Sequence, residues 1–221
     1  MPNEIIVRTV PEKALDDFKW VIGWIATTTG KIGMPATDRN RSAAACFAIA
    51  QEHHEAIVRL AEHQLFASSF ALLRVVFEAY IRGLWLSLCA TDKEVCRFIA
   101  LKEPPKLDEL LKAIDNHDMF AETPLSGYKA DNYKQLCAFT HTGGQQIMRW
   151  IQEAGIEPNY HIEDVMKVIA TSEQLSLLSL LGVTSMSNEP EVAVSVIEEF
   201  VRVRDELYPT RSELESRVKG A

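Results

Sequence analysis

Three charged residues interrupt the apolar segment from residue 70 to residue 90, FALLRVVFEAYIRGLWLSLCA. Arg74, Glu78 and Arg82 are four residues apart, so on an α-helix their side chains lie along one face. The residues around that face are almost all apolar, which is typical of a helix at the centre of a bundle. Because buried charges persist only when they are paired, the pattern predicts either a polar site inside a helical bundle or a structural ion-pair network.

The charge balance limits the partners that the chain can attract. Its 221 residues include 31 acidic and 23 basic side chains, a net charge of −8, which gives no general attraction to nucleic acid or to an anionic membrane. An RNA partner would need a local basic patch, and we expect no DNA partner and no membrane association. The N-terminal residues lack the basic and apolar stretches of a signal peptide, so we expect a cytoplasmic protein.

The apolar segment 70–90 is long enough to span a membrane, but its charges argue against insertion. Its two arginines would cost roughly 5 to 7 kcal/mol on insertion scales. The surrounding apolar residues only offset that cost before Glu78 is counted. We therefore predict a core helix of a soluble protein.

Helical signals follow one another along the chain, and no convincing two-residue alternation indicates a strand. The sequence predicts an all-α fold, a single-domain bundle of about seven to eight helices over residues 1–209, with a polar C-terminal tail at 210–221. The expected helices cover residues 11–28, 40–65, 69–90, 91–101, 106–116, 131–151, 161–182 and 189–207. Thr91-Asp-Lys-Glu94 predicts a capping box, residues 116–130 a surface loop, and Asp131 a cap for the helix that follows.

A second candidate for chemistry is His141, in the stretch LCAFTHTGG (136–144). Hydroxyl side chains flank it, and two glycines allow another backbone or a ligand to approach closely. A histidine there can be a general acid or base, or can simply form a hydrogen bond to a neighbouring helix. The residues that could bind a ligand are Arg74, Glu78, Arg82, Tyr133, Lys134, Thr140 and His141.

Two short segments, Glu52-His53-His54-Glu55 and Glu62-His63, contain residue types found in metal sites of helical bundles. Their spacing is poor, because His53 and His54 point about 100° apart on a helix and no E-x-x-H or H-E-x-x-H signature is present. We expect a solvated face there, no metal site and no cofactor. The four cysteines, which form no C-x-x-C pair, are expected to be reduced core thiols. They are Cys46, Cys89, Cys96 and Cys137.

The segment from Ala71 to Tyr80 (ALLRVVFEAY), together with Asn132-Tyr133 and Thr140-His141-Thr-Gly-Gly144, resembles uncharacterised all-helical bacterial families that are distantly similar to HEPN domains. The resemblance covers roughly residues 45 to 150. It implies a helical bundle, a polar seam between the two helices and a homodimer. Many HEPN proteins cut RNA in toxin–antitoxin or phage-defence systems with an arginine and a histidine that are separated by a gap of four to six residues. No arginine precedes a histidine by that gap here; the closest match is Lys134 with His141.

These observations favour a protein that binds a ligand or partner, such as RNA or a small anion, through the polar seam. The alternative is a HEPN-like ribonuclease or toxin or phage-defence effector. In that case His141 is the catalytic acid or base, and Arg74 or Lys134 contacts phosphate. A metal-dependent bundle enzyme is a third, weaker hypothesis.

Overall fold

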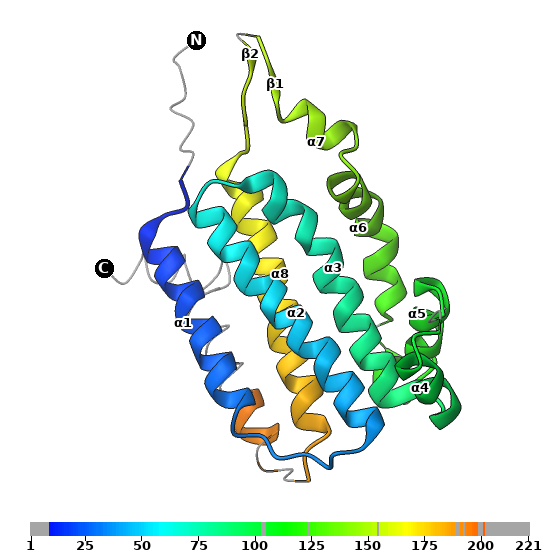
Figure 1. The fold of residues 1–221 in the computed structure, drawn as a ribbon. Helices are drawn as coiled ribbons and strands as arrows, with labels where there is room; N and C mark the ends of the chain where they lie inside the picture. The colour runs from blue at the N-terminus through cyan, green and yellow to red at the C-terminus, as the bar shows by residue number, and fades with distance from the viewer. Residues whose placement is uncertain are drawn as a thin grey trace.

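Helix α3 (Phe66–Leu84) lies in the middle of the molecule, packed against α2 on one side, α6 on the other and α8 behind (Figure 1). It is the helix that carries Arg74, Glu78 and Arg82. The computed structural model describes residues 9–102, 105–122, 124–153, 155–188, 191, 193–198 and 201. Within these ranges the fold is all-α, as expected, apart from one very short hairpin.

The main bundle consists of four helices: α1 (Glu12–Thr29), α2 (Asp38–Glu62), α3 and α8 (Ile162–Ser185). Helices α2, α3 and α8 meet around the ring of Phe47, which is fully buried. Gly83 on α3 and Gly182 on α8 both lie against this ring. Glycine at these two places lets three helices approach one aromatic side chain, so the ring fixes their spacing.

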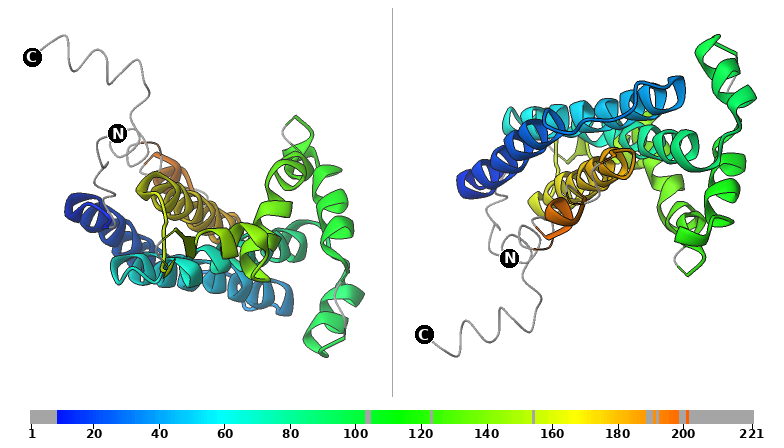
Figure 2. Two further views of the ribbon diagram at one scale, coloured as in Figure 1. Left: turned by 90° about the horizontal axis from the view of Figure 1, so that it is seen from above. Right: turned by 90° about the horizontal axis from the view of Figure 1, so that it is seen from below.

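The segment from η1 to α7 projects to one side of this bundle, as Figure 2 shows from above and below. A π-helical turn, η1 (Trp85–Cys89), continues α3 and is followed by α4 (Asp92–Ile99), α5 (Leu107–Asp115), a 3₁₀ turn η2 (Asp118–Phe120), α6 (Leu125–Thr140) and α7 (Gly144–Met148). The predicted capping box is present, because Thr91 and Glu94 exchange both hydrogen bonds at the start of α4. The described residues from Glu12 to Ser185 form ten helical segments, more than the seven or eight expected, because the short segments η1, η2 and α7 count separately.

The expected surface loop at residues 116–130 is wrong in its second half, since α6 already begins at Leu125. Asp131 consequently lies inside this helix and does not cap it. The first turn of α6 is capped from another element, because the Asp115 carboxylate accepts hydrogen bonds from the backbone N–H groups of Leu125 (2.7 Å) and Ser126 (3.2 Å). A cap supplied by a residue ten positions away leaves no local sequence signal.

A hairpin that the sequence did not predict connects α7 to α8. Strands β1 (Ile151–Gln152) and β2 (Gly155–Ile156) pair antiparallel, with Ile151 opposite Ile156. Two residues per strand are too few for a two-residue alternation to be recognised. The expected helix at 189–207 is present at the described residues 191, 193–198 and 201; its other residues and the predicted tail at 210–221 lie outside the described part of the chain.

Helix α8 has the length and apolar composition of a membrane-crossing segment, whereas the sequence had singled out residues 70–90 for that test. Of its most apolar stretch, 67% is buried inside the bundle. A core helix of a soluble protein meets the same two criteria, so this observation is weak evidence for a membrane span.

Candidate functional site

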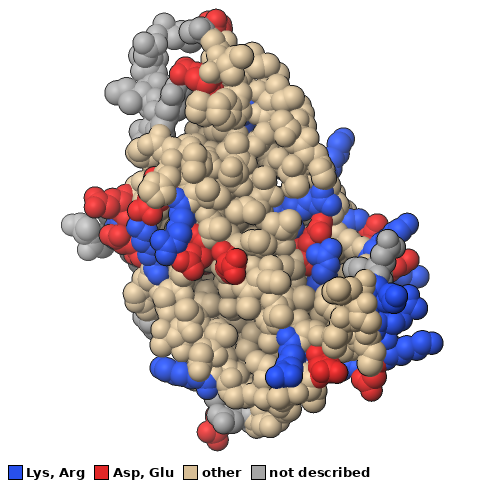
Figure 3. All heavy atoms as spheres, in the orientation of Figure 1, with Lys and Arg blue, Asp and Glu red and all other residues tan. Residues whose placement is uncertain are grey.

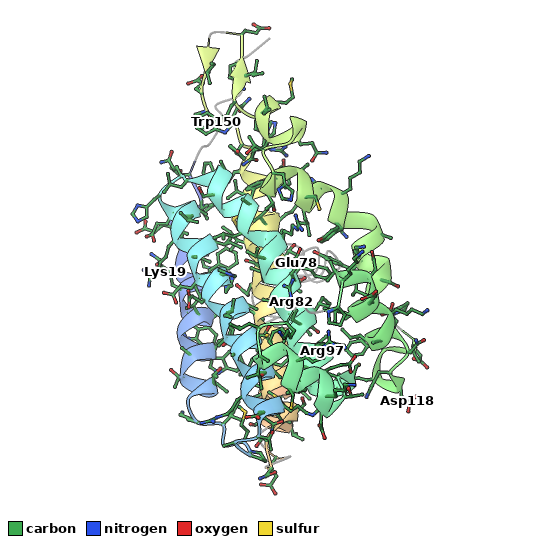
Figure 4. The ribbon with its side chains drawn as sticks, turned by 45° about the vertical axis from the view of Figure 1, so that its right-hand side comes forward. Lys19, Glu78, Arg82, Arg97, Asp118 and Trp150 are labelled. Carbon is green, nitrogen blue, oxygen red and sulfur yellow. The ribbon has the colours of Figure 1, made fainter. Side chains whose placement is uncertain are left out.

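A polar seam runs between α3 and α6, with Glu78 at its centre (Figure 4). The Glu78 carboxylate accepts three hydrogen bonds: from Arg74 Nε at 2.7 Å, from Arg82 Nη2 at 3.2 Å and from the Tyr133 hydroxyl at 2.8 Å. Both arginines reach it from the next turn of the same helix, and the tyrosine reaches it from α6. We refer to Arg74, Glu78, Arg82, Tyr133 and His141 as the α3–α6 seam.

Arg74 contacts three other residues of the seam. Besides its ion pair with Glu78, its guanidinium lies 5.2 Å from the centre of the Tyr133 ring, and its Nη1 lies 2.5 Å from Nε2 of His141. Because an arginine can only donate, Nε2 of this histidine is the acceptor and the proton of the neutral ring lies on Nδ1. The pair thus joins an arginine of α3 to a histidine at the end of α6.

The turn after α6 fixes the position of His141. The helix ends at Thr140, and His141 follows as its C-cap with its side chain exposed. The left-handed backbone position in this turn belongs to Thr142 (φ 53°) and not to a glycine. Gly143 donates to the Ala138 carbonyl at 2.7 Å, and a Cβ at position 143 would lie 3.0 Å from the backbone of that residue. The close approach expected of the glycine pair is therefore made by Gly143 against α6 itself.

The ionisation of the seam follows from its partial burial. Side-chain exposure is 21% for Arg74, 15% for Glu78 and 34% for Arg82. Burial alone would raise the pKa of the Glu78 carboxyl, but the hydrogen bonds from Tyr133 and Arg74 outweigh it and the pKa is lowered. Burial and the hydrogen bond to Glu78 raise the pKa of Tyr133 to about 12. Glu78 is therefore an anion and Tyr133 a neutral donor at physiological pH.

Two predicted ligand-binding residues lie apart from this arrangement. The hydroxyl of Thr140 is a donor within hydrogen-bond distance of two backbone carbonyls, those of Leu136 (3.0 Å) and Ala71 (3.2 Å), and the second of these contacts links α6 to α3. Lys134 is exposed on α6 and has no contact with the seam among the described residues. Lys129, which sequence reasoning missed, instead lies 5.1 Å from the face of the Tyr133 ring and pairs with Asp108. Its position, four residues before Tyr133 on α6, is the signal that could have indicated it.

Within the stretch Glu52–Glu55, His54 departs from the solvated face that the sequence predicted, because its side chain is buried against α8, whereas Glu52 is exposed. Its Nδ1 lies 2.8 Å from the hydroxyl of Ser172, and that hydroxyl donates to the Ile169 carbonyl, so the histidine is the donor in this contact. Burial lowers the pKa of His54 to about 3, which keeps the ring neutral. Among the described residues, no three His, Cys, Asp or Glu side chains lie close enough together to hold a metal ion.

The cysteines are free, as expected, but they are not all in the core. Cys46 is buried, and its burial raises the pKa of the thiol to about 11. Cys89 and Cys137 are half-buried and Cys96 is exposed. The exposed position of Cys96 on α4 contradicts the prediction of a core thiol, because an eight-residue surface helix presents most of its residues to solvent.

Comparison with known proteins agrees with the uncharacterised all-helical family that the sequence indicated. Residues 47–209 match the model of a family of unknown function, DUF6988, and the chain belongs to this family. The match includes all of the α3–α6 seam. Comparisons with curated proteins and with solved structures give no match.

Proposed function

We propose that this chain binds an anionic ligand or partner through the α3–α6 seam, with Arg74 and His141 as the groups that contact the anion. The observation that carries the proposal is the way Arg74 is held: Glu78 fixes Nε, His141 contacts Nη1 and the Tyr133 ring covers one face. A guanidinium held in this way loses little conformational freedom when it binds a ligand. Its planar fork suits a phosphate or carboxylate group, such as that of RNA or of a small anion.

A titration with inorganic phosphate, followed by NMR of the histidine side chains, tests this proposal. We expect the ring signals of His141 to shift in the wild-type protein and to stay unchanged in Arg74→Gln. Arg59→Gln is a matched control, because Arg59 also pairs with a glutamate of its own helix but lies exposed on α2. Equal shifts in all three proteins, or none in any of them, would contradict the proposal.

A second candidate function is ribonuclease activity in a HEPN-like toxin or phage-defence effector. The observation that favours it is the 2.5 Å contact between Arg74 and His141, which places an arginine beside an exposed histidine although the two belong to different helices. His141 would take or give the proton of a ribose hydroxyl or leaving oxygen, and Arg74 would stabilise the charge on the phosphate. Lys134, exposed on α6 seven residues before His141, would be a further phosphate contact.

Growth after induction of wild-type protein and of His141→Ala, at matched soluble levels, separates the two functions. Growth arrest with RNA cleavage that disappears in the variant supports the ribonuclease. If neither protein affects growth or RNA, binding without catalysis is the better description.

The expected homodimer and cytoplasmic location belong to the same proposal. Light scattering on the purified protein tests the dimer, and a single species with the mass of one chain would remove it. Cell fractionation tests the location.

A further inference from the structure

An open pocket of about 640 Å³ lies between α4 and α5, at the end of α3. Its walls come from residues along the whole of α4, from the start of α5 and from Trp85, which follows Arg82 of the seam by three residues. None of the residues that line it belongs to the α3–α6 seam. Its size is within the range of pockets that hold small organic ligands.

Three cations surround this pocket. Lys93 and Arg97 are one turn apart on α4, and Lys106 directly precedes α5. In the described part of the chain, none of their side chains forms a hydrogen bond or a close ion pair, although the charge of Arg97 also helps to lower the pKa of Glu94. Figure 3 shows that Lys and Arg gather on this side of the molecule, over α4 and α5, and Figure 4 shows Arg97 beyond Arg82 along the same side.

The two carboxylates of the pocket are already engaged in helix capping. Glu94 accepts hydrogen bonds from the backbone N–H and the hydroxyl of Thr91, both at 2.7 Å. Glu109 accepts from the backbone N–H of Lys106 at 3.0 Å. The hydrogen bonds from Thr91 lower the pKa of Glu94, so it stays ionised. Each carboxylate is bound to the N-terminus of its own helix, which leaves the three cations as the groups available to a ligand.

The pocket also has apolar lining residues. These are the half-buried Phe98 and Pro105 and the buried Trp85. An inorganic anion would leave these apolar side chains in contact with water. A ligand that combines a phosphate with a flat ring would satisfy both the cations and the apolar lining.

We propose that the α4–α5 pocket binds a nucleoside phosphate, with Lys93, Arg97 and Lys106 on the phosphate and Phe98 beside the base. The ligand is either a free nucleotide or a nucleotide unit of a single-stranded nucleic acid, since both present the same chemistry. This site goes beyond the proposed function of the seam and does not depend on it.

Fluorescence anisotropy with two labelled probes, adenosine monophosphate and a 12-nucleotide single-stranded RNA, tests the site. The pocket variant is Lys93→Gln/Arg97→Gln. The matched control is Lys102→Gln/Lys112→Gln, which removes two exposed lysines from the same region, neither of which lines the pocket. Circular dichroism confirms that both variants are folded.

We expect the pocket variant to lose about tenfold or more in affinity, because two charge-assisted contacts are removed, and the control to stay within about twofold. This result with the mononucleotide identifies a free nucleotide as the ligand, and the same result with the RNA alone identifies a nucleic acid strand. Absence of binding by both probes, or equal losses in the two variants, would overturn the proposal. The Arg74→Gln variant, measured in parallel, reports on the seam separately.

Discussion

Substituting alanine for Gly83 or Gly182 tests how α2, α3 and α8 are held together. Alanine is normally the better helix residue, by about 1 kcal/mol. Here an added Cβ at Gly83 would lie 2.5 Å from the Phe47 ring, and one at Gly182 would lie 2.4 Å from it. The ring is fully buried, and both added methyl groups would meet its outer edge at Cε1 and Cζ, so the ring has little room to move away.

The size of the effect follows from these opposing contributions. Overpacking of a core costs about 1–3 kcal/mol, and contacts this short in a confined place justify the upper end. After subtracting the gain in helix propensity, we expect each variant to lose about 2 kcal/mol of unfolding free energy. For a chain of this size that corresponds to a decrease in Tm of about 4–8 °C.

Urea denaturation and thermal unfolding, followed by circular dichroism, provide the assay. Gly23→Ala on α1 is the matched control, because nothing lies within 4 Å of the Cβ added there, and it should gain up to about 1 kcal/mol. The double variant Phe47→Leu/Gly182→Ala should lose less unfolding free energy than the two single variants lose together, because the smaller side chain relieves the clash. If Gly83→Ala and Gly182→Ala were as stable as Gly23→Ala, the described three-helix junction would be wrong.

Three further predictions concern ionisable groups and assembly. His54 has a pKa of about 3 in the folded protein against an ordinary value of 6.5. Its contribution to stability is therefore complete above pH 6.5, and between pH 6.5 and 3 it falls by about 1.4 kcal/mol per pH unit as the unfolded chain takes up the proton. Urea unfolding at pH 7 and at pH 5.5 should show this extra loss of stability in the wild-type protein and not in His54→Gln. Glu78→Gln should lose about 1–2 kcal/mol of unfolding free energy, which is less than the loss of a fully buried ion pair because Arg74 and Arg82 are partly exposed. A double-mutant cycle with Tyr133→Phe should give a coupling energy of about 1 kcal/mol. The absence of coupling would argue against the hydrogen bond between Tyr133 and Glu78. Light scattering should give the mass of two chains, and a mass that stays at one chain over the accessible concentrations would contradict the homodimer.

Much of the secondary structure follows from local rules that the sequence displays. The all-α class, the central helix with charges at 74, 78 and 82, and the capping box at Thr91 depend on residues within four positions of one another. The ion pairs of Glu78 with both arginines are of this kind, because i,i+4 neighbours on a helix meet whatever packs against them. For the same reason, the start of α6 was missed: its cap, Asp115, comes from another element.

The composition of the candidate site was decided by the tertiary structure. Tyr133 and Glu78 are 55 residues apart, and Arg74 and His141 are 67 apart, so their contacts depend on how α6 packs on α3. The same packing excludes Lys134 from the seam, and the packing of α8 on α2 buries His54. Periodicity shows which residues share a face of one helix, but the partner of that face depends on the summed fit of distant side chains, which only the folded chain determines.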